Sequence, residues 1–258
     1  NPNLLILLTL LVLIFLSRIN KLNFGQLVIF GFLTMLLAEL ELIFGAVFII
    51  GLFLALLLCQ RQIFFSKKIL PVILGGIIVE LPRAIFELRH NFLQTKVLLG
   101  MFSQHTVGHV DKLLRLKIFA ETWSGIIPNF SAVLSVILSV ITILLFIMTL
   151  RQEKIIEKKK FCLELLIIIT VFFAATLFYN KDFWNYYLTG LPVLFAICLV
   201  FAFFSLRGVL SSKKLFALIV AYLFFLSGPQ NVIAGFQNPN FIGDAAVYRN
   251  QLAAIDYV

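Results

Sequence analysis

The 258 residues are 62% hydrophobic and only 13% charged, they include 29 phenylalanines, and their mean hydropathy is +1.07. Soluble globular chains carry about a quarter charged residues, so this composition excludes an ordinary soluble domain and indicates an integral membrane protein. The net charge of +9 lies mostly in short gaps between apolar runs, where orientation signals occur, which argues against a nucleic-acid partner.

Apolar runs without the alternation typical of β-barrel strands recur along the whole chain. Because lipid-exposed backbone must satisfy its own hydrogen bonds, we expect an all-α integral membrane protein with about eight transmembrane helices in residues 1–229. The second and third runs are short, so they are either tilted or re-entrant spans, or one long helix bent near Glu39. In chain order the runs cover residues 4–16, 24–38, 42–58, 69–86, 130–150, 161–178, 188–204 and 215–226.

Two stretches outside the runs are more polar. Residues 87–127 are expected to form a long external loop, in which the apolar positions between Lys112 and Phe119 predict an amphipathic helix at the membrane interface. Residues 230–258 are expected to form an external C-terminal tail, which either ends the protein or begins a further region.

Basic residues fall in alternate gaps between the runs. Because positive charge near span ends favours the cytoplasmic side, we expect these basic gaps to be cytoplasmic. The protein is then expected to be a multi-pass protein of the inner (plasma) membrane. Glu39, Glu41, the long loop and the tail are then external. The basic gaps hold Arg18 and Lys21, then Arg61, Lys67 and Lys68, then Arg151 and four lysines, then Arg207, Lys213 and Lys214.

The charged stretch ELPRAIFELRHNF at residues 80–92 ends the fourth run. Glu80, Arg83 and Glu87 are spaced by three and four residues, so on a helix they share a face and can neutralise one another. Arg89 and His90 follow at the helix exit, where a guanidinium fork and an imidazole can hold a phosphate. The alternative is that they anchor to lipid head groups or to Glu87.

Glu39 and Glu41 lie at the end of a short apolar run, and acids near the bilayer are functional candidates by default. Carboxylates two residues apart on a helix do not share a face, so they are not a ready-made acid and base pair. A solvated turn between two helices is the competing interpretation.

An aromatic segment follows the sixth run and contains Tyr179, Trp184, Tyr186 and Tyr187. Such a cluster is typical of the interfacial aromatic belt. With Asp182 and the neighbouring asparagines, it also offers rings and hydrogen bonds suited to a sugar.

No metal site is expected. His105 and His109 have the i, i+4 spacing of helical metal ligands, but no third ligand lies nearby. Cys59, Cys162 and Cys198 show neither metal-ligand nor disulfide spacing and are expected to fill the core or face lipid.

Three segments resemble one family. They are the acidic pair Glu39 and Glu41 ahead of an apolar helix, FELRHNFLQT at residues 86–95, and DFWNYYLTGLP at residues 182–192. Together they resemble the middle and C-terminal part of the bacterial family 39 glycosyltransferases, the protein O-mannosyltransferase-like and aminoarabinose-transferase-like superfamily. The resemblance covers most of the chain, and FELRHNF is its most specific motif.

The resemblance implies an inverting enzyme of the GT-C type that transfers a sugar from a polyprenyl-phosphate donor to a glycan, lipid or protein acceptor outside the cytoplasm. The lipid-linked sugar is the donor substrate, and no cofactor is implied. In that family the catalytic carboxylate lies in the first external loop, which no acid here matches. Because the chain begins with Asn1 rather than Met, we expect an internal fragment whose catalytic acid lies upstream, with Glu39 and Glu41 as weaker candidates.

Arg89 is expected to stabilise the departing lipid phosphate, with His90 and Arg83 assisting, because fixed cations favour charge that develops at a leaving group. The expected substrate-binding residues are Arg83, Glu87, Arg89, His90, Asp182, Tyr186 and Tyr187.

A transporter or lipid flippase is the alternative from another class. Such proteins tend to contain repeats with broken helices around a mid-membrane site, and the sequence shows no repeat. Away from the charged stretch, charge within the predicted spans is confined to Glu164, beside a basic gap. A structural membrane subunit is a third interpretation, but it leaves the long loop unexplained.

Overall fold

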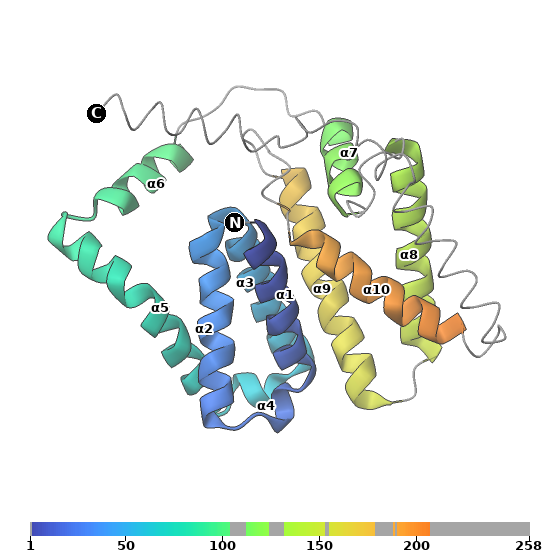
Figure 1. The fold of residues 1–258 in the computed structure, drawn as a ribbon, viewed down its shortest axis with the longest axis horizontal. Helices are drawn as coiled ribbons and strands as arrows, with labels where there is room; N and C mark the ends of the chain where they lie inside the picture. The colour runs from blue at the N-terminus through green and yellow to red at the C-terminus, as the bar shows by residue number, and fades with distance from the viewer. Residues whose placement is uncertain are drawn as a thin grey trace, which may run out of the picture.

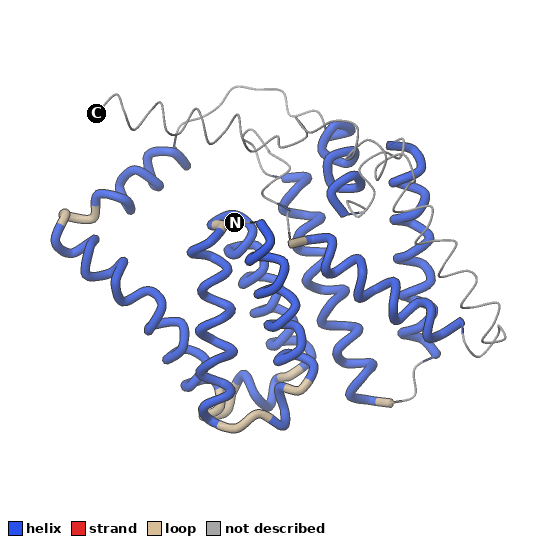
Figure 2. The backbone as a smooth tube through the Cα atoms, viewed as in Figure 1, coloured by secondary structure: helices blue, strands red, loops and turns tan. Residues whose placement is uncertain are grey.

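The computed structural model describes residues 2–103, 112–123, 132–152, 155–178, 188 and 190–206. Within these ranges every regular element is a helix (Figure 1), and Figure 2 shows the short loops that join the elements from α1 to α6, which confirms the all-α fold class for the described residues. The elements are α1 (Pro2–Ser17), η1 (Ile19–Lys21), α2 (Phe24–Leu40), α3 (Leu42–Cys59), α4 (Arg61–Phe64), α5 (Ile69–Arg89), α6 (Leu93–Ser103), α7 (Lys112–Trp123), α8 (Ala132–Gln152), α9 (Ile156–Phe178) and α10 (Leu191–Leu206).

Each of the first seven predicted apolar runs coincides with a helix: α1, α2, α3, α5, α8, α9 and α10. Three helices in the described part of the chain, α3, α5 and α9, are long and apolar enough to cross a membrane, and further apolar segments lie in α1, α2, α8 and α10. The structure therefore supports a membrane-associated helical protein. The eighth run, 215–226, and the tail, 230–258, lie outside the described residues.

The predicted loop at residues 87–127 contains two helices, α6 and α7. The helix expected between Lys112 and Phe119 is confirmed by α7, which packs against α8, α9 and α10. Its buried face contributes Phe119 and Trp123, whose rings lie 5.3 Å from Phe173 and 5.4 Å from Phe195 in edge-to-face contacts. Because these rings are in the core, α7 is part of the bundle.

The second and third runs form a helical hairpin. Asn23 begins α2 with a capping box, in which its side chain accepts from the Gln26 N–H and the Gln26 side chain accepts from the Asn23 N–H. Glu41 alone separates α2 from α3, in an extended conformation with φ −148° and ψ 100°. The two helices then pack against each other. The alternative of one long helix bent near Glu39 is therefore wrong.

Aromatic rings tie α3 to α9 at the centre of the core. Phe44 and Phe48 are fully buried, and their ring centroids lie 5.0 Å and 6.5 Å from that of Phe172. These separations fall within the range in which aromatic pairs attract beyond simple burial. The contact fixes α9 beside the hairpin.

The α5 helix touches the bundle along one side only. At its crossing with α2, a Cβ on Gly31 would overlap the Val72 carbonyl and a Cβ on Gly75 would overlap the Val28 carbonyl, so the two backbones are in direct contact. Beyond this crossing α5 diverges from the bundle toward α6 (Figure 1). Only 11% of the residues in the apolar stretch of α5 are buried inside the protein, as expected of a helix that faces lipid.

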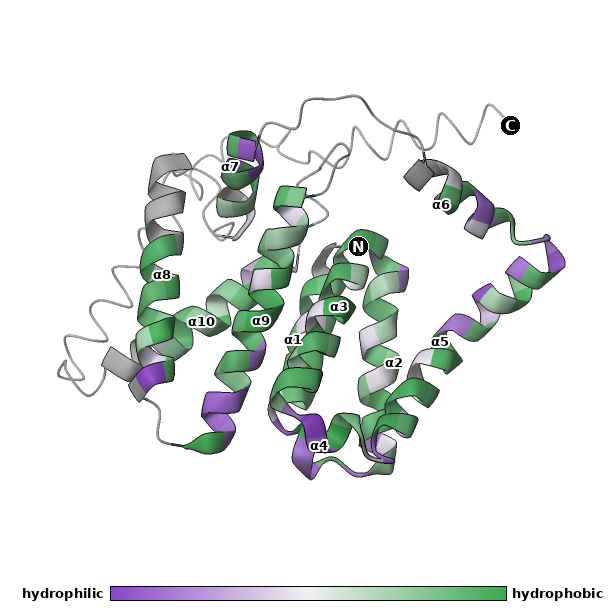
Figure 3. Ribbon diagram, turned by 180° about the vertical axis from the view of Figure 1, so that it is seen from behind, coloured by the Kyte–Doolittle hydropathy of each residue, from purple (hydrophilic) through white to green (hydrophobic). Residues whose placement is uncertain are grey.

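Charge separates toward the two ends of the bundle. The end of α1, α4 and the starts of α5 and α9 form what we call the basic end, where hydrophilic residues gather in Figure 3. Lys21 Nζ lies 3.0 Å from Glu157 Oε2, and Lys68 Nζ donates to the Asn20 carbonyl at 3.2 Å, so three of the predicted basic gaps meet there. The opposite end, where α2 meets α3 at Glu41, we call the acidic end.

Candidate functional site

An ion pair joins α2 to α5 at the acidic end. Arg83 Nη1 lies 3.1 Å from Glu39 Oε1, and the two side chains are 28% and 31% exposed. The sequence predicts that Arg83 is neutralised by Glu80 and Glu87 on its own helix, but the structure gives it a partner on α2. Because the α2–α5 crossing brings the backbones together, the ends of both helices come within side-chain reach.

Glu80 lies one turn before Arg83 and faces the same ion pair. Its carboxyl group lies within hydrogen-bonding reach of Glu39, while its Oε1 atom is buried without a hydrogen-bond partner among the described residues. The spacing along α5 indicated Glu80 only as a neighbour of Arg83.

Pro82 lies between Glu80 and Arg83 inside α5. Proline has no N–H, so the Ile78 carbonyl four residues earlier loses its usual helical donor. Membrane helices tolerate this where another group can supply the hydrogen bond. Pro82 therefore leaves a gap in the hydrogen-bond ladder of α5 immediately before Arg83.

Glu87 holds the corner between α5 and α6. Its carboxylate accepts hydrogen bonds from the Gln94 N–H at 2.9 Å, the Thr95 N–H at 3.0 Å and the Thr95 hydroxyl at 2.7 Å. These N–H groups belong to the first turn of α6, which has no intrahelical acceptors for them. Only 6% of Glu87 is exposed. The residue expected to bind substrate is thus occupied as a helix cap.

Two consecutive left-handed residues make this corner possible. Asn91 has φ 52° and Phe92 has φ 59°, and the Phe92 N–H donates to the Glu87 carbonyl at 2.8 Å, closing α5 with a Schellman-type bond. Asparagine adopts this conformation readily, whereas a phenylalanine does so rarely. FELRHNF is therefore a helix–corner–helix motif, and its backbone fixes where Arg89 and His90 project.

Arg89 and His90 lie on the outside of the corner and are both exposed. The His90 ring stacks on Phe86 with centroids 4.0 Å apart, and its Nδ1 atom lies 2.9 Å from the Phe86 carbonyl. If Nδ1 carries the proton, it donates to that carbonyl and Nε2 is left as the free acceptor. Within the described ranges Arg89 forms no ion pair, so its guanidinium is available to an anion.

Glu41 occupies the link between α2 and α3. Its backbone N–H donates to the Leu37 carbonyl and its carbonyl accepts from Gly45, which closes the hairpin. Partial burial raises the pKa of its side chain above the ordinary value, and the Ile43 backbone N–H offsets part of that rise. The structure does not pair Glu41 with Glu39, as expected from their two-residue spacing.

Several predicted residues lie outside the described residues: Asp182, Tyr186, Tyr187, His105 and His109. Among the residues that the structure does describe, no group of three or more His, Cys, Asp or Glu side chains has a metal-binding arrangement. Cys59, Cys162 and Cys198 form no disulfide in the part of the chain that the structure describes, and Cys162 and Cys198 are buried.

Sequence reasoning missed a second polar group, at the basic end. The Gln60 side-chain amide donates to Glu164 Oε1 at 2.7 Å and accepts from Asn20 at 3.2 Å. Glu164 stood out in the sequence as a charge inside an apolar run, but nothing in the pattern connects it to Gln60, which lies 104 residues earlier.

Comparison with known proteins found no matching family model and no match among curated proteins or solved structures.

Proposed function

We propose that this protein is a membrane glycosyltransferase of the GT-C type, similar to family 39, which moves a sugar from a polyprenyl-phosphate donor to a glycan, lipid or protein acceptor. In this proposal the acidic end faces outward from the inner membrane. The observation that carries it is Arg89, an exposed cation without an ion-pair partner among the described residues, held at a fixed corner where an apolar helix ends.

The chemistry of the donor fits this position. When the sugar leaves, negative charge develops on a phosphate whose lipid tail lies beside apolar helices. A preorganised cation at that point lowers the barrier because it needs no reorganisation during the reaction. The corner that Glu87 caps supplies this preorganisation, and with Nδ1 of His90 donating to the Phe86 carbonyl, its Nε2 atom can accept a hydrogen bond from a sugar hydroxyl.

The Arg83–Glu39 ion pair supports different roles for the two arginines. Arg83 is already committed to Glu39, so we assign it to positioning α5, and Arg89 to the phosphate. Arg89 lies nine positions after Glu80, which is about 13 Å along the helix axis. The Glu39–Glu80 carboxyl pair is therefore too far from the phosphate to act on the bond that breaks, and the catalytic carboxylate is assigned elsewhere.

The test uses the whole protein in proteoliposomes with a radiolabelled polyprenyl-phosphate sugar. Replacing Arg89→Ala should reduce transfer by about 100-fold, the loss typical of removing one charge-stabilising donor, and Arg89→Lys should retain part of the rate. Lys96→Ala, which removes an exposed cation from α6, is the matched control and should leave the rate unchanged. Unchanged transfer and donor affinity in Arg89→Ala would contradict the proposal.

The same experiment distinguishes a glycosyltransferase from a transporter or lipid flippase. Transfer produces a covalently glycosylated acceptor and free polyprenyl phosphate, which chromatography resolves from the donor. A flippase would move the intact labelled donor between leaflets and form neither product. Movement without product would overturn the glycosyltransferase assignment.

A further inference from the structure

A polar cavity of about 240 Å³ lies at the basic end, opposite the candidate site. It is enclosed by the end of α1, the turn after it, Gln60 and the first turns of α9. The lining residues are Leu16, Ser17, Arg18, Asn20, Lys21, Gln60, Glu157, Phe161 and Glu164. The mixture of two acids with two cations at one cavity is unusual in so apolar a chain.

Glu164 is the buried end of this cavity. It is 1% exposed and lies eight residues into α9, about 12 Å from the start of the helix. Its Oε1 atom accepts from Gln60, whereas its Oε2 atom is buried with no hydrogen-bond partner in the described part of the chain. Leaving a buried carboxyl oxygen unpaired is unfavourable, so the site is suited to a ligand that donates a hydrogen bond.

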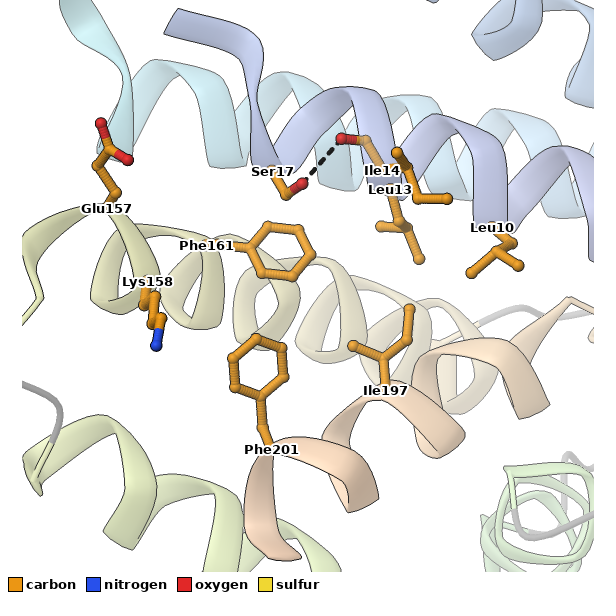
Figure 4. Close-up of a pocket in the computed structure, with 9 residues that line it drawn as sticks. All are labelled: Leu10, Leu13, Ile14, Ser17, Glu157, Lys158, Phe161, Ile197 and Phe201. Atoms are coloured by element: carbon orange, nitrogen blue, oxygen red, sulfur yellow. Dashed lines mark hydrogen bonds between the residues drawn. The ribbon is translucent and has the colours of Figure 1, made fainter. Parts of the chain in front are cut away.

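An apolar cavity of about 340 Å³ adjoins the polar one. Figure 4 shows its lining residues on α1, α9 and α10, where the Phe161 and Phe201 rings lie next to each other with Ile197 beside them. The two rings lie 5.9 Å apart. Both cavities share Ser17, Glu157 and Phe161 in their walls, so a single molecule can extend from one into the other.

Positively charged side chains lie at the mouth of the polar cavity, where they can bind a negatively charged group of a ligand. Lys21 is paired with Glu157, and both side chains are largely exposed, at 70% and 61%. Arg18 is exposed, lines the cavity and has no ion-pair partner within the described ranges. Its planar guanidinium is suited to bind a phosphate through two parallel hydrogen bonds.

We propose that these adjoining cavities bind an aminophospholipid of the ethanolamine type. Its ammonium group donates to Glu164 Oε2, its phosphate contacts Arg18, and one acyl chain occupies the apolar cavity between α1, α9 and α10. A primary ammonium carries three N–H donors, whereas the quaternary ammonium of a choline lipid has none and cannot satisfy the buried oxygen. The site therefore selects ethanolamine over choline lipids. It does not depend on the proposed glycosyl transfer at the opposite end.

The first test needs no variant. The whole protein is placed in nanodiscs of phosphatidylcholine. Each sample also contains a small fraction of one test lipid: phosphatidylethanolamine, its monomethyl derivative or its dimethyl derivative. Native mass spectrometry then measures which lipid stays bound to the protein. Retention should be strongest for phosphatidylethanolamine and lowest for phosphatidylcholine, falling as N–H donors are removed. Equal retention of phosphatidylethanolamine and phosphatidylcholine would overturn the proposal. Soluble phosphoethanolamine should compete poorly if the acyl chain contributes, and full competition would assign the site to a free phosphoamine.

The second test removes the acceptor. Glu164→Gln should weaken binding of phosphatidylethanolamine by about 10- to 100-fold, the loss expected for one hydrogen bond to a charged group. Glu80→Gln is the matched control because it alters a carboxyl group that also has an unpartnered oxygen, but at the acidic end. Arg18→Gln should weaken phosphatidylethanolamine and phosphatidylcholine alike, since both carry the phosphate. An unchanged preference in a folded Glu164→Gln protein would contradict the assignment.

Discussion

Arg83 on α5 pairs with Glu39 on α2 across a distance of 3.1 Å, although Glu80 and Glu87 lie within about one turn of it on its own helix. Glu87 is occupied by the first turn of α6, and Glu80 faces Glu39. The Arg83 guanidinium thus pairs with Glu39 on α2 and lies near Glu80 on its own helix. This arrangement locks the acidic ends of α2 and α5 together, where α5 has few other contacts.

The ion pair predicts an asymmetric response to substitution. Arg83→Gln should destabilise the protein more than Glu39→Gln, because it leaves Glu39 and Glu80 facing each other without a cation. A double-mutant cycle should give a coupling of about 0.2–1 kcal/mol, as for other partly exposed pairs. Unfolding in detergent with added dodecyl sulfate measures the free energies. Additive single-variant effects would show that the contact contributes nothing.

The crossing of α2 and α5 predicts a sharp contrast between adjacent glycines. Gly75→Ala should destabilise the protein by about 1–3 kcal/mol, since its Cβ would overlap the Val28 carbonyl and the backbones would have to separate. Gly76→Ala is the matched control on the same helix, because its Cβ would meet only Met35 at an ordinary 3.9 Å. It should be neutral or stabilising by about 0.5–1 kcal/mol, the helix-propensity gain.

Thermal denaturation of both variants in the same detergent measures this contrast. The Gly75→Ala protein should also lose the Arg83–Glu39 coupling, because the helix ends would move apart. Equal stability of the two variants would mean that α2 and α5 do not cross at these glycines.

The helices themselves were predictable because they need only local information. An apolar run between charged gaps is sufficient to define α3, α8 or α9, and the predicted helix near Phe119 was found. The partners of charged groups were not predictable in this way. Helical spacing identifies neighbours on one helix, whereas Glu39 is brought to Arg83 by a crossing 44 residues distant in sequence.

The corner after α5 shows a second limit. Sequence patterns associate left-handed turns with glycine, and here Asn91 and Phe92 adopt that conformation with no glycine present. Glu87 could be recognised as part of a charged motif, but its role depends on the direction in which α6 leaves. The link between Gln60 and Glu164 was hidden for the same reason, since only tertiary packing brings them together.

The cap at Glu87 predicts a local effect. Glu87→Ala should release the first turn of α6, so the Gln94 and Thr95 amides should exchange hydrogen much faster while α2 and α3 keep their protection. Thr95→Val, which removes only the hydroxyl donor, should produce a smaller change at the same amides. Hydrogen–deuterium exchange with mass spectrometry resolves these segments. Unchanged exchange in Glu87→Ala would contradict the capping role.

Glu41 gives stability a specific dependence on pH. Burial raises the pKa of this carboxyl group in the folded protein, so the folded state binds its proton more tightly than the unfolded state does. Its contribution to stability is therefore complete below the unfolded pKa, about 4.3, and is lost as the pH rises through the higher folded value. Glu41→Gln stays neutral throughout. The variant should gain stability relative to the native protein as the pH rises from 4 to 7. Unfolding in detergent at both pH values measures the free energy of unfolding of each protein. If the difference between the two free energies is the same at both pH values, Glu41 titrates alike in the folded and unfolded states.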